Sequence, residues 1–444
     1  MTLTNNETLL SKGSPETEIS EGEMEELVNQ ALSKAIGKLN QTGPVLILPP
    51  DITRFHSRAG VLTDICSRQL GSRLGAVMPA LGTHMPMSQE ELKHMFPNTP
   101  LDKFRVHDWR NDITELGRID ADWVEKTTHG KVRYDWPVQV NKLLRDGGFS
   151  LIISIGQVVP HEVAGLANHL KNIFVGTGGK EAIDKSHFAG ASYGMERMMG
   201  RIDTPVRLMF DEGYNLFGQK IPPILYILTV IGPKTRDQNT GSSQEAVRGL
   251  YIGFGRDCFE KACELSRKVN IDLLEEPINK AIVYLDPKEF RTTWLGNKAV
   301  YRTRMAMADN AELLVLAPGL ERFGEDLGAD KLIRKYGYRP TEVILEKASK
   351  EKDISENLSA AAHLIHGSSE GRFLIRYCPG PKVSRSEIES VGYEWGDLKE
   401  AQNRYNMEKL ALGWNTLDDG ERVFFISNPA LGLWAERQRF MSKP

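Results

Sequence analysis

Three of the chain's ten histidines lie within one short stretch, residues 160–187, which reads PHEVAGLANHLKNIFVGTGGKEAIDKSH. The stretch directly follows SLIISIG, an apolar run typical of a buried strand. Imidazole binds zinc, nickel, copper and iron, and its near-neutral pKa suits proton transfer. The pattern therefore predicts a metal or proton-transfer site, with a chance cluster of surface residues as the alternative.

Within this stretch, the candidates are spaced along the chain rather than clustered as a motif. His161 follows a proline, Lys171 lies ten residues further on, and His187 lies sixteen beyond that. A lysine beside an apolar run becomes a nucleophile or a covalent attachment point when desolvation lowers its pKa. His169 has no evident role and is expected on the surface. GTGGK at 176–180 lacks the phosphate-loop pattern and favours a turn.

A second candidate segment, PPDITRFHS at 49–57, ends another apolar run. Asp51 and Thr53 are suited to cap a following helix. Arg54 would then lie at a helix N-terminus, where backbone N–H groups favour an anion. The alternative is a plain cap with a solvated arginine. In the next such segment, GTHM at 82–85, His84 is expected to be a loop or cap residue rather than a ligand.

The segment RVHDWRND at 105–112 places His107 beside Asp108. A histidine that acts as a base needs a partner to orient it. Adjacent strand residues point to opposite faces, so Asp108 is not assured as that partner. A partly buried structural histidine is the alternative interpretation.

Composition excludes several classes of protein. The net charge of −3 gives no electrostatic case for binding nucleic acid or an anionic membrane. No apolar run reaches the length of about eighteen residues that a membrane span needs. The polar, acidic start does not resemble a secretory signal, so a cytoplasmic location is expected. Four scattered cysteines fit reduced thiols and not a metal site.

Short apolar runs ending in Gly or Pro alternate with amphipathic stretches, which predicts an α/β fold with mainly parallel sheets flanked by helices. Helices are expected over 21–39 and over 243–269. Strands are expected at 44–51, 73–84, 150–156, 223–232, 281–286, 312–319, 372–380 and 422–428. Ligands of such sheets bind beyond the strand carboxyl ends. That rule points at residues 49–54, 81–84, 157–171 and 318–326.

A change from a long helix to a new strand near NIDLLEEPINK suggests two α/β domains. We expect residues 1–275 to form an N-terminal domain that carries the lysine and histidine candidates. Residues 276–444 would form a C-terminal domain that closes over the site, with the active site in the cleft between the two.

The order of these motifs resembles the lactate racemase family. The matching elements are PDITR, GTH and HD, then PH with a lysine ten residues later and a histidine twenty-six after the first. No single piece is specific, but the order and the two spacings together are. The family comprises nickel-dependent 2-hydroxy acid racemases and epimerases, which are isomerases.

The resemblance implies a nickel-pincer nucleotide, a pyridinium mononucleotide with two sulfur-bearing substituents and a ring carbon bound to nickel. Lys171 would form its covalent thioamide link, and His187 would be the protein's nickel ligand. His107 and His161 would be the acid/base pair. Asp51 and Arg54 would lie at the cofactor and substrate anions. One histidine would take the hydroxyl proton while hydride passes from C2 to the cofactor, and hydride then returns to the other face.

Some segments depart from lactate racemase itself. GLANHLKNIF replaces a Gly-Gly pair before the attachment lysine, and LAPGLERFGED replaces a Gly-rich stretch. Lys298, Tyr301 and Arg302 are candidate substrate contacts in the second domain. Trp294 and Trp395 are candidates for stacking on the cofactor. These cationic and hydroxyl groups suit a larger acid than lactate, and an aldonic sugar acid epimerised at C2 is the leading substrate hypothesis.

Two other classes stay open from the sequence. A zinc or iron hydrolase would use His107, His161 and His187 but leaves Lys171 unexplained. A non-catalytic carrier of the nucleotide would not need two bases. The expected partners are a small 2-hydroxy acid and the proteins that synthesise the cofactor, with neither nucleic acid nor membrane. Assembly into a homo-oligomer is left open.

Overall fold

The computed structural model describes residues 6–40, 42–233, 245–430 and 432–442. The chain divides into two compact units. The first consists of Met1–Ser186 and Gly200–Asn270, and the second of His187–Met199 and Ile271–Pro444. The first division falls inside helix α7 (Lys180–Tyr193), so that one continuous helix belongs partly to each unit.

The first unit is built on a six-stranded sheet of order β1-β10-β9-β6-β2-β3. The strands β3, β2, β6 and β9 run parallel, and β10 and β1 are antiparallel to their neighbours. Two small antiparallel pairs, β4–β5 and β7–β8, lie outside this sheet. The strands are β1 Thr8–Gly13, β2 Val45–Leu48, β3 Leu74–Val77, β4 Ile113–Ile119, β5 Trp136–Asn141, β6 Leu151–Gln157, β7 Pro160–His161, β8 Gly165–Leu166, β9 Ile224–Pro233 and β10 Glu245–Phe254.

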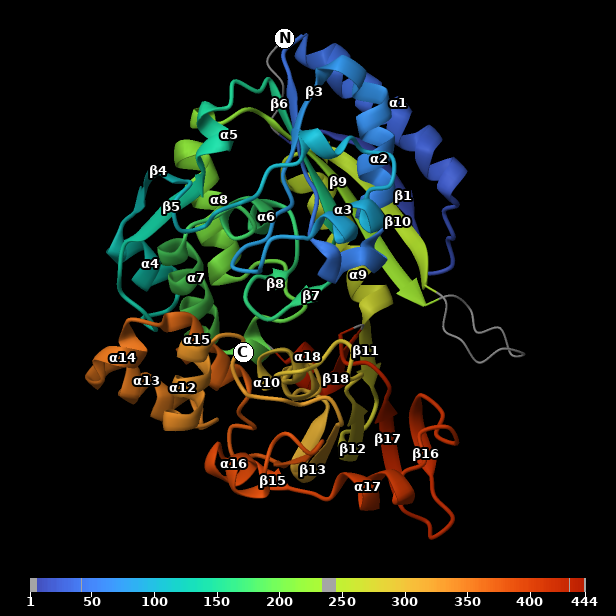
Figure 1. Ribbon diagram of the computed structural model, residues 1–444, viewed down its shortest axis with the longest axis vertical. Coiled ribbons are helices and arrows are strands. Elements are labelled where there is room, and N and C mark those ends of the chain that lie inside the picture. Colours follow the sequence, from blue (N-terminus) through green and yellow to red (C-terminus); the bar gives the residue numbers. More distant parts are fainter. Residues whose placement is uncertain (1–5, 41, 234–244, 431, 443–444) are drawn as a thin grey trace. The chain divides into compact units, whose positions relative to one another are not determined.

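Helices cover both faces of this sheet. α1 and α2 share one apolar core with alternate residues of the strands, and Figure 1 shows these two helices together beside the sheet. α9 packs on β9 and β10 at the opposite face, where the ring of His169 lies between Phe259 of α9 and Tyr226 of β9. The helices of this unit are α1 Glu21–Leu39, η1 Ile52–Ser57, α2 Ala59–Leu70, η2 Gly71–Arg73, α3 Gln89–Met95, η3 Leu101–Lys103, α4 Ala121–Thr127, α5 Lys142–Asp146, α6 Leu170–Phe174, α8 Pro205–Phe217, η5 Gly218–Lys220 and α9 Arg256–Asn270.

The helix predicted over 21–39 is confirmed as α1. Ser20 caps it by accepting a hydrogen bond from the backbone of Glu23, and Asn40 ends it in the left-handed conformation. The helix predicted over 243–269 is wrong in its first half. Residues 243–244 lie outside the described residues, and 245–254 form strand β10, which pairs with β9 and β1. Gly253 lets the backbone before β1 approach β10 closely, because a Cβ there would meet the carbonyl oxygen of Glu7 at 2.5 Å.

The second unit contains a six-stranded sheet of order β15-β14-β13-β12-β17-β16, parallel except at β16, and a two-stranded sheet of β11 and β18. Its strands are β11 Ile271–Leu274, β12 Ile278–Tyr284, β13 Met307–Ala317, β14 Leu374–Pro379, β15 Glu394–Trp395, β16 Gly413–Thr416, β17 Arg422–Ile426 and β18 Leu433–Glu436. Its helices are η4 Met195–Arg197, α10 Thr293–Gly296, α11 Lys298–Tyr301, α12 Leu327–Tyr336, α13 Thr341–Lys350, α14 Lys352–Ser355, α15 Leu358–His366, α16 Arg385–Ser390, α17 Leu398–Arg404 and α18 Arg437–Met441.

The predicted class, an α/β fold with mainly parallel sheets flanked by helices, is confirmed in both units. All eight predicted strands are present as β2, β3, β6, β9, β12, β13, β14 and β17. Among the described residues, no helix has the length and apolar character needed to cross a membrane.

Candidate active site

Three of the predicted strand-end segments meet at one edge of the first sheet. The backbone N–H of Ala80 donates to the carbonyl of Pro49 at 2.8 Å, which joins the ends of β3 and β2. The amide of Asn172 in α6 donates to the carbonyl of Leu48 at 3.2 Å and to the hydroxyl of Ser154 at 3.0 Å. Helix α6 is therefore fastened to the carboxyl ends of β2 and β6, and it carries Lys171.

Asp51 follows β2 as the cap of η1, where its carboxylate accepts the backbone N–H of Thr53 at 3.1 Å. The element it caps is a short 3-10 helix with a kink at Arg54, and not the regular helix expected. His84 Nδ1 donates to the other Asp51 oxygen at 2.6 Å. Burial by itself raises the pKa of Asp51, but the hydrogen bond from His84 and the nearby positive charges outweigh it and lower that pKa. Asp51 is thus a buried carboxylate held in its charged form.

Lys171 is the second residue of α6, and its side chain is half-buried. Burial of the ammonium lowers the pKa of Lys171 to about 8, and the positive charge of Arg54 lowers it further. The carboxylates of Glu162 and Asp51 oppose this shift. The structure therefore brings Asp51, Arg54 and Lys171 within electrostatic reach of one another. An amine with this pKa is partly unprotonated near neutral pH and can act as a nucleophile.

His107 lies in the loop between η3 and β4, with only 2% of its surface exposed. Its Nε2 donates to the carbonyl of Gly178 at 3.1 Å, and its Nδ1 accepts from the side-chain amide of Asn141 at 3.1 Å. Asp108 instead binds the backbone of Arg110, so it is not the orienting partner of His107. Burial lowers the pKa of His107 to about 4, whereas a value near neutrality was expected.

His161 ends the two-residue strand β7, directly beyond β6, and is 6% exposed. Its Nδ1 accepts the backbone N–H of Val163 at 3.1 Å. The neutral ring therefore carries its proton on Nε2, where it donates rather than accepts. For His161 to act as a base at Nε2, the hydrogen bond from Val163 has to be released.

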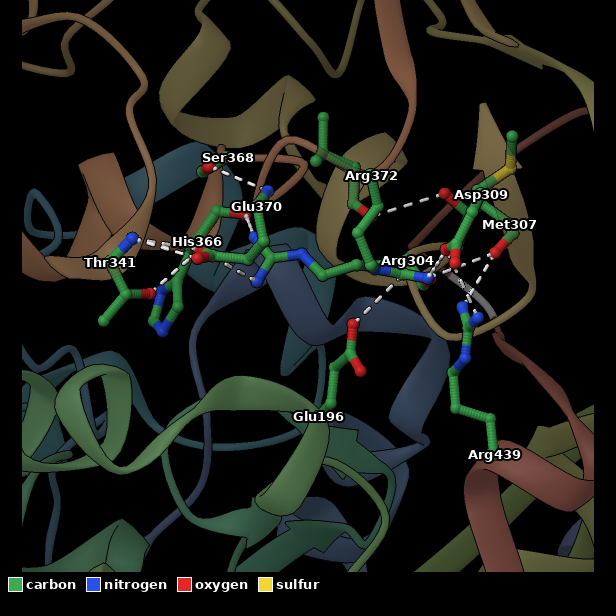
Figure 2. A network of polar contacts seen from close by, with 12 residues as sticks. Glu196, Arg304, Met307, Asp309, Thr341, His366, Ser368, Glu370, Arg372 and Arg439 are labelled. Carbon is green, nitrogen blue, oxygen red and sulfur yellow. Dashed lines mark hydrogen bonds and ion pairs between the residues drawn. The ribbon is translucent and has the colours of Figure 1, made fainter. Parts of the chain in front are cut away.

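His187 belongs to the second unit, in the part of α7 beyond the division. The segment 187–199 is fastened there by polar contacts, which Figure 2 shows around Arg372 and Glu196. The Arg372 guanidinium donates to the Glu196 carboxylate at 3.3 Å, to the Asp309 carboxylate at 3.1 Å and to the Arg304 carbonyl at 2.6 Å. The segment that begins at His187 is thus held in the second unit through Glu196.

The predicted second-domain contacts lie on or next to α11. Lys298 is half-buried with its amine 5.5 Å from the centre of the Phe290 ring. Tyr301 and Arg302 are both buried, and the Arg302 guanidinium donates to the carbonyl of Gly432 at 2.9 Å. Of the two tryptophans, Trp294 stacks on His363 with ring centres 4.3 Å apart. The guanidinium of Arg385 lies 5.5 Å from the centre of the Trp395 ring.

Sequence reasoning missed several residues of the first unit. His84 lies in a loop, as expected, and its hydrogen bond to Asp51 is a contact that the sequence does not indicate. Asn141 orients His107 from 34 positions away, a pairing that no local pattern signals. His169 was expected on the surface, but it is 3% exposed. Apolar neighbours in LANHLKNIF were the available signal that this segment is buried.

No three His, Cys, Asp or Glu side chains come together as a metal site within the part of the chain that the structure describes. The assignment of His187 as a single protein ligand of nickel is a different arrangement and stays a prediction.

A family profile for the lactate racemase N-terminal domain matches residues 2–198. Two solved structures share the fold. A protein from Thermotoga maritima is 23% identical with a TM-score of 0.76, covering 92% of this chain and 97% of its own. The lactate racemase apoprotein from Thermoanaerobacterium thermosaccharolyticum is 16% identical with a TM-score of 0.69, covering 98% and 97%. No curated protein sequence matches the chain.

The fold and the converging strand ends define a protein with two α/β units, a fold shared with these two structures. On the match over residues 2–198, the N-terminal part of the chain belongs to the lactate racemase N-terminal domain family. The resemblance drawn from the order and spacing of the sequence motifs is confirmed.

Proposed function

We propose that this protein is a racemase or epimerase of a 2-hydroxy acid that uses a nickel-pincer nucleotide bound covalently to Lys171. The match to the lactate racemase N-terminal domain family supports the class of isomerase. The observation that carries the proposal is the Lys171 amine, whose pKa is lowered to about 8 within electrostatic reach of Asp51 and Arg54. A nucleophilic amine beside a cation is what attachment of an anionic nucleotide requires.

The residues present fit this cofactor. Arg54 supplies a positive charge for a phosphate or carboxylate, and it is held by η1 next to the buried carboxylate Asp51. Asp51 and Glu162 keep the charge around Lys171 balanced. His187 would supply one imidazole to nickel, a metal that imidazole suits. When bound, the cofactor supplies the acceptor for the C2 hydride, chemistry that protein side chains lack.

The proposed work of the two histidines is to move the hydroxyl proton of the substrate. The neutral ring of His161 carries its proton on Nε2, so His161 would act as the proton donor to a substrate oxygen. His107 is neutral at physiological pH, but Asn141 occupies its accepting nitrogen. A switch of the Asn141 amide would free Nδ1 of His107 to receive a proton, so Asn141 is the group that would control this base.

The finer parts of the proposal rest on the sequence. An aldonic sugar acid, epimerised at C2, stays the substrate hypothesis, with Lys298, Tyr301 and Arg302 as its second-domain contacts. The domain division at 275/276 and an active site in the cleft between the domains stay predictions.

Intact-mass measurement of protein from a nickel-replete native host tests the proposal. The wild-type chain should carry an adduct, and peptide mapping should locate it on Lys171. Lys171→Ala should lose the adduct and all racemisation while staying folded. Lys171→Arg keeps the positive charge but provides no nucleophile, so it should behave like the alanine variant.

Lys180→Ala is the matched control, because Lys180 is an exposed lysine at the start of the next helix. It should keep both the adduct and the activity. An adduct that persists in Lys171→Ala would contradict attachment to Lys171. A wild-type protein that racemises without any adduct would contradict the use of a covalently bound cofactor.

A further inference from the structure

One buried arginine, Arg207, holds the loop that runs from His161 to Lys171. Its side chain is fully buried in α8, whose start is fixed by the cap Thr204 and by proline at the first helical position. The guanidinium donates to the carbonyl of Leu166 at 2.6 Å and to the carbonyl of Asn168 at 3.2 Å. A planar guanidinium makes two such bonds in a fixed geometry, which an ammonium cannot reproduce.

Each of the two carbonyls belongs to the framework of one candidate residue. Leu166 is the strand partner of Pro160, directly before His161. The carbonyl of Asn168 accepts the backbone N–H of Lys171 at 3.3 Å and so begins the turn of α6. Arg207 therefore joins the backbone that carries His161 to the backbone that carries Lys171.

Within this loop, the turn at Asn168 and His169 is strained. Asn168 and His169 are consecutive residues with φ of 69° and 57°, a conformation that non-glycine residues seldom adopt. Such strain persists only where the surroundings enforce it, and it gathers at functional sites. Gly156 leaves room for the Asn168 side chain in this turn, because a Cβ there would lie 2.5 Å from its Nδ2.

The ring of His169 is the second restraint on this turn. It packs between Tyr226 and Phe259, with ring centres 4.3 Å and 4.9 Å away. Burial lowers the pKa of His169 well below its usual range, and the positive charges of Arg207 and Arg256 add to this effect. A neutral ring is compatible with the buried guanidinium of Arg207, which lies 4.5 Å from the centre of the Phe259 ring.

We propose that Arg207 is a positioning residue that sets the placement of Lys171 and His161 by holding the strained turn at Asn168 and His169. The inference deepens the proposed function and rests on it, because it concerns the same lysine and histidine. Arg207 touches neither of their side chains through a hydrogen bond and acts on them through the backbone. Its positive charge also opposes protonation of Lys171.

The test is the reactivity of Lys171 in full-length protein whose amine is unmodified. Trace acetylation by acetic anhydride, followed by mass spectrometry of the Lys171 peptide across a pH series, reports the titration of this one amine. In the wild type, half-maximal labelling is expected at about pH 8. In Arg207→Met the midpoint should move to higher pH, and a shift of one unit would slow labelling at pH 8 roughly fivefold.

Arg207→Lys separates position from charge. It keeps a positive charge but cannot bridge both carbonyls, so its midpoint should also rise, by less than in Arg207→Met. If Lys171 in Arg207→Lys is labelled with the wild-type pH dependence, only the charge of Arg207 affects this lysine, and the positioning role is overturned. Should Arg207→Met fail to fold, the lysine variant decides the question.

Arg248→Met is the matched control. Arg248 is also buried in the first unit, and it likewise donates to two backbone carbonyls, those of Thr17 and Pro233. It should lower the melting temperature without moving the Lys171 midpoint, and an equal shift in this control would overturn the inference. An absent cofactor adduct would contradict only the proposed function, because the labelling is performed on the free amine.

Discussion

At the scale of single residues, the burial of His107 makes stability depend on pH. Its pKa is about 4 in the folded chain, against 6.5 when unperturbed, so the unfolded chain binds more protons between these two values. The stabilising effect of the neutral imidazole is complete above pH 6.5 and is lost as the pH falls toward 4. The loss over this window should be about 3 kcal/mol.

Urea unfolding of the wild type and of His107→Asn at pH 6.5 and at pH 4 checks this expectation. The variant should show a free energy of unfolding that falls less over the window. His94→Asn, at an exposed histidine of the same unit, should keep the wild-type slope. Equal slopes in the wild type and His107→Asn would contradict the prediction.

Arg54 provides a second prediction at this scale. Arg54 is the cation that lowers the pKa of Lys171 most, and it is expected to bind an anionic group of cofactor or substrate. Arg54→Ala should weaken that binding by about 2–4 kcal/mol, the range for truncating one partner of a buried charge pair. Titration calorimetry with the substrate and with the nucleotide measures it, and wild-type affinity for both ligands would rule it out.

At the scale of elements, the segment 187–199 depends on the contacts of Arg372. This guanidinium joins Glu196 to Asp309 and to two backbone carbonyls. Arg372→Met should lower the free energy of local opening of this segment by about 1 kcal/mol, the upper range for a partly exposed ion pair. Backbone amides of 187–199 should then exchange with deuterium roughly fivefold faster.

Arg385→Met offers a control for that experiment, because Arg385 forms an exposed pair with Glu389 in the same unit. Exchange in 187–199 should be unchanged in this variant. If Arg372→Met left the exchange rates of the segment at wild-type values, the contacts in Figure 2 would not be what holds it.

At the scale of the whole molecule, each unit has an apolar core of its own. We expect the two cores to unfold in separate steps, so that the calorimetric enthalpy exceeds the van't Hoff enthalpy. Ile153→Ala in the first core and Leu313→Ala in the second should each destabilise one unit by about 2–5 kcal/mol. Differential scanning calorimetry should show each substitution lowering a different transition, whereas one shared transition lowered by both would refute the division.

The sequence by itself determined the elements that follow from local patterns. Apolar runs located four strands of each six-stranded sheet, and the helical spacing of apolar residues, with Glu early and Lys late, located α1. The order and spacing of PDITR, GTH and PH determined the family. These signals work because strand and helix preferences depend on residues close together in the chain.

Only the tertiary structure decided the partners of the site residues. His84 lies 33 positions from Asp51, and Asn141 lies 34 positions from His107, so no local pattern links them. Residues 245–254 have a helical periodicity in sequence, yet their pairing with β9 and β1 makes them strand β10. Burial of His169 and the low pKa of His107 likewise arise from packing between distant segments, which local sequence does not encode.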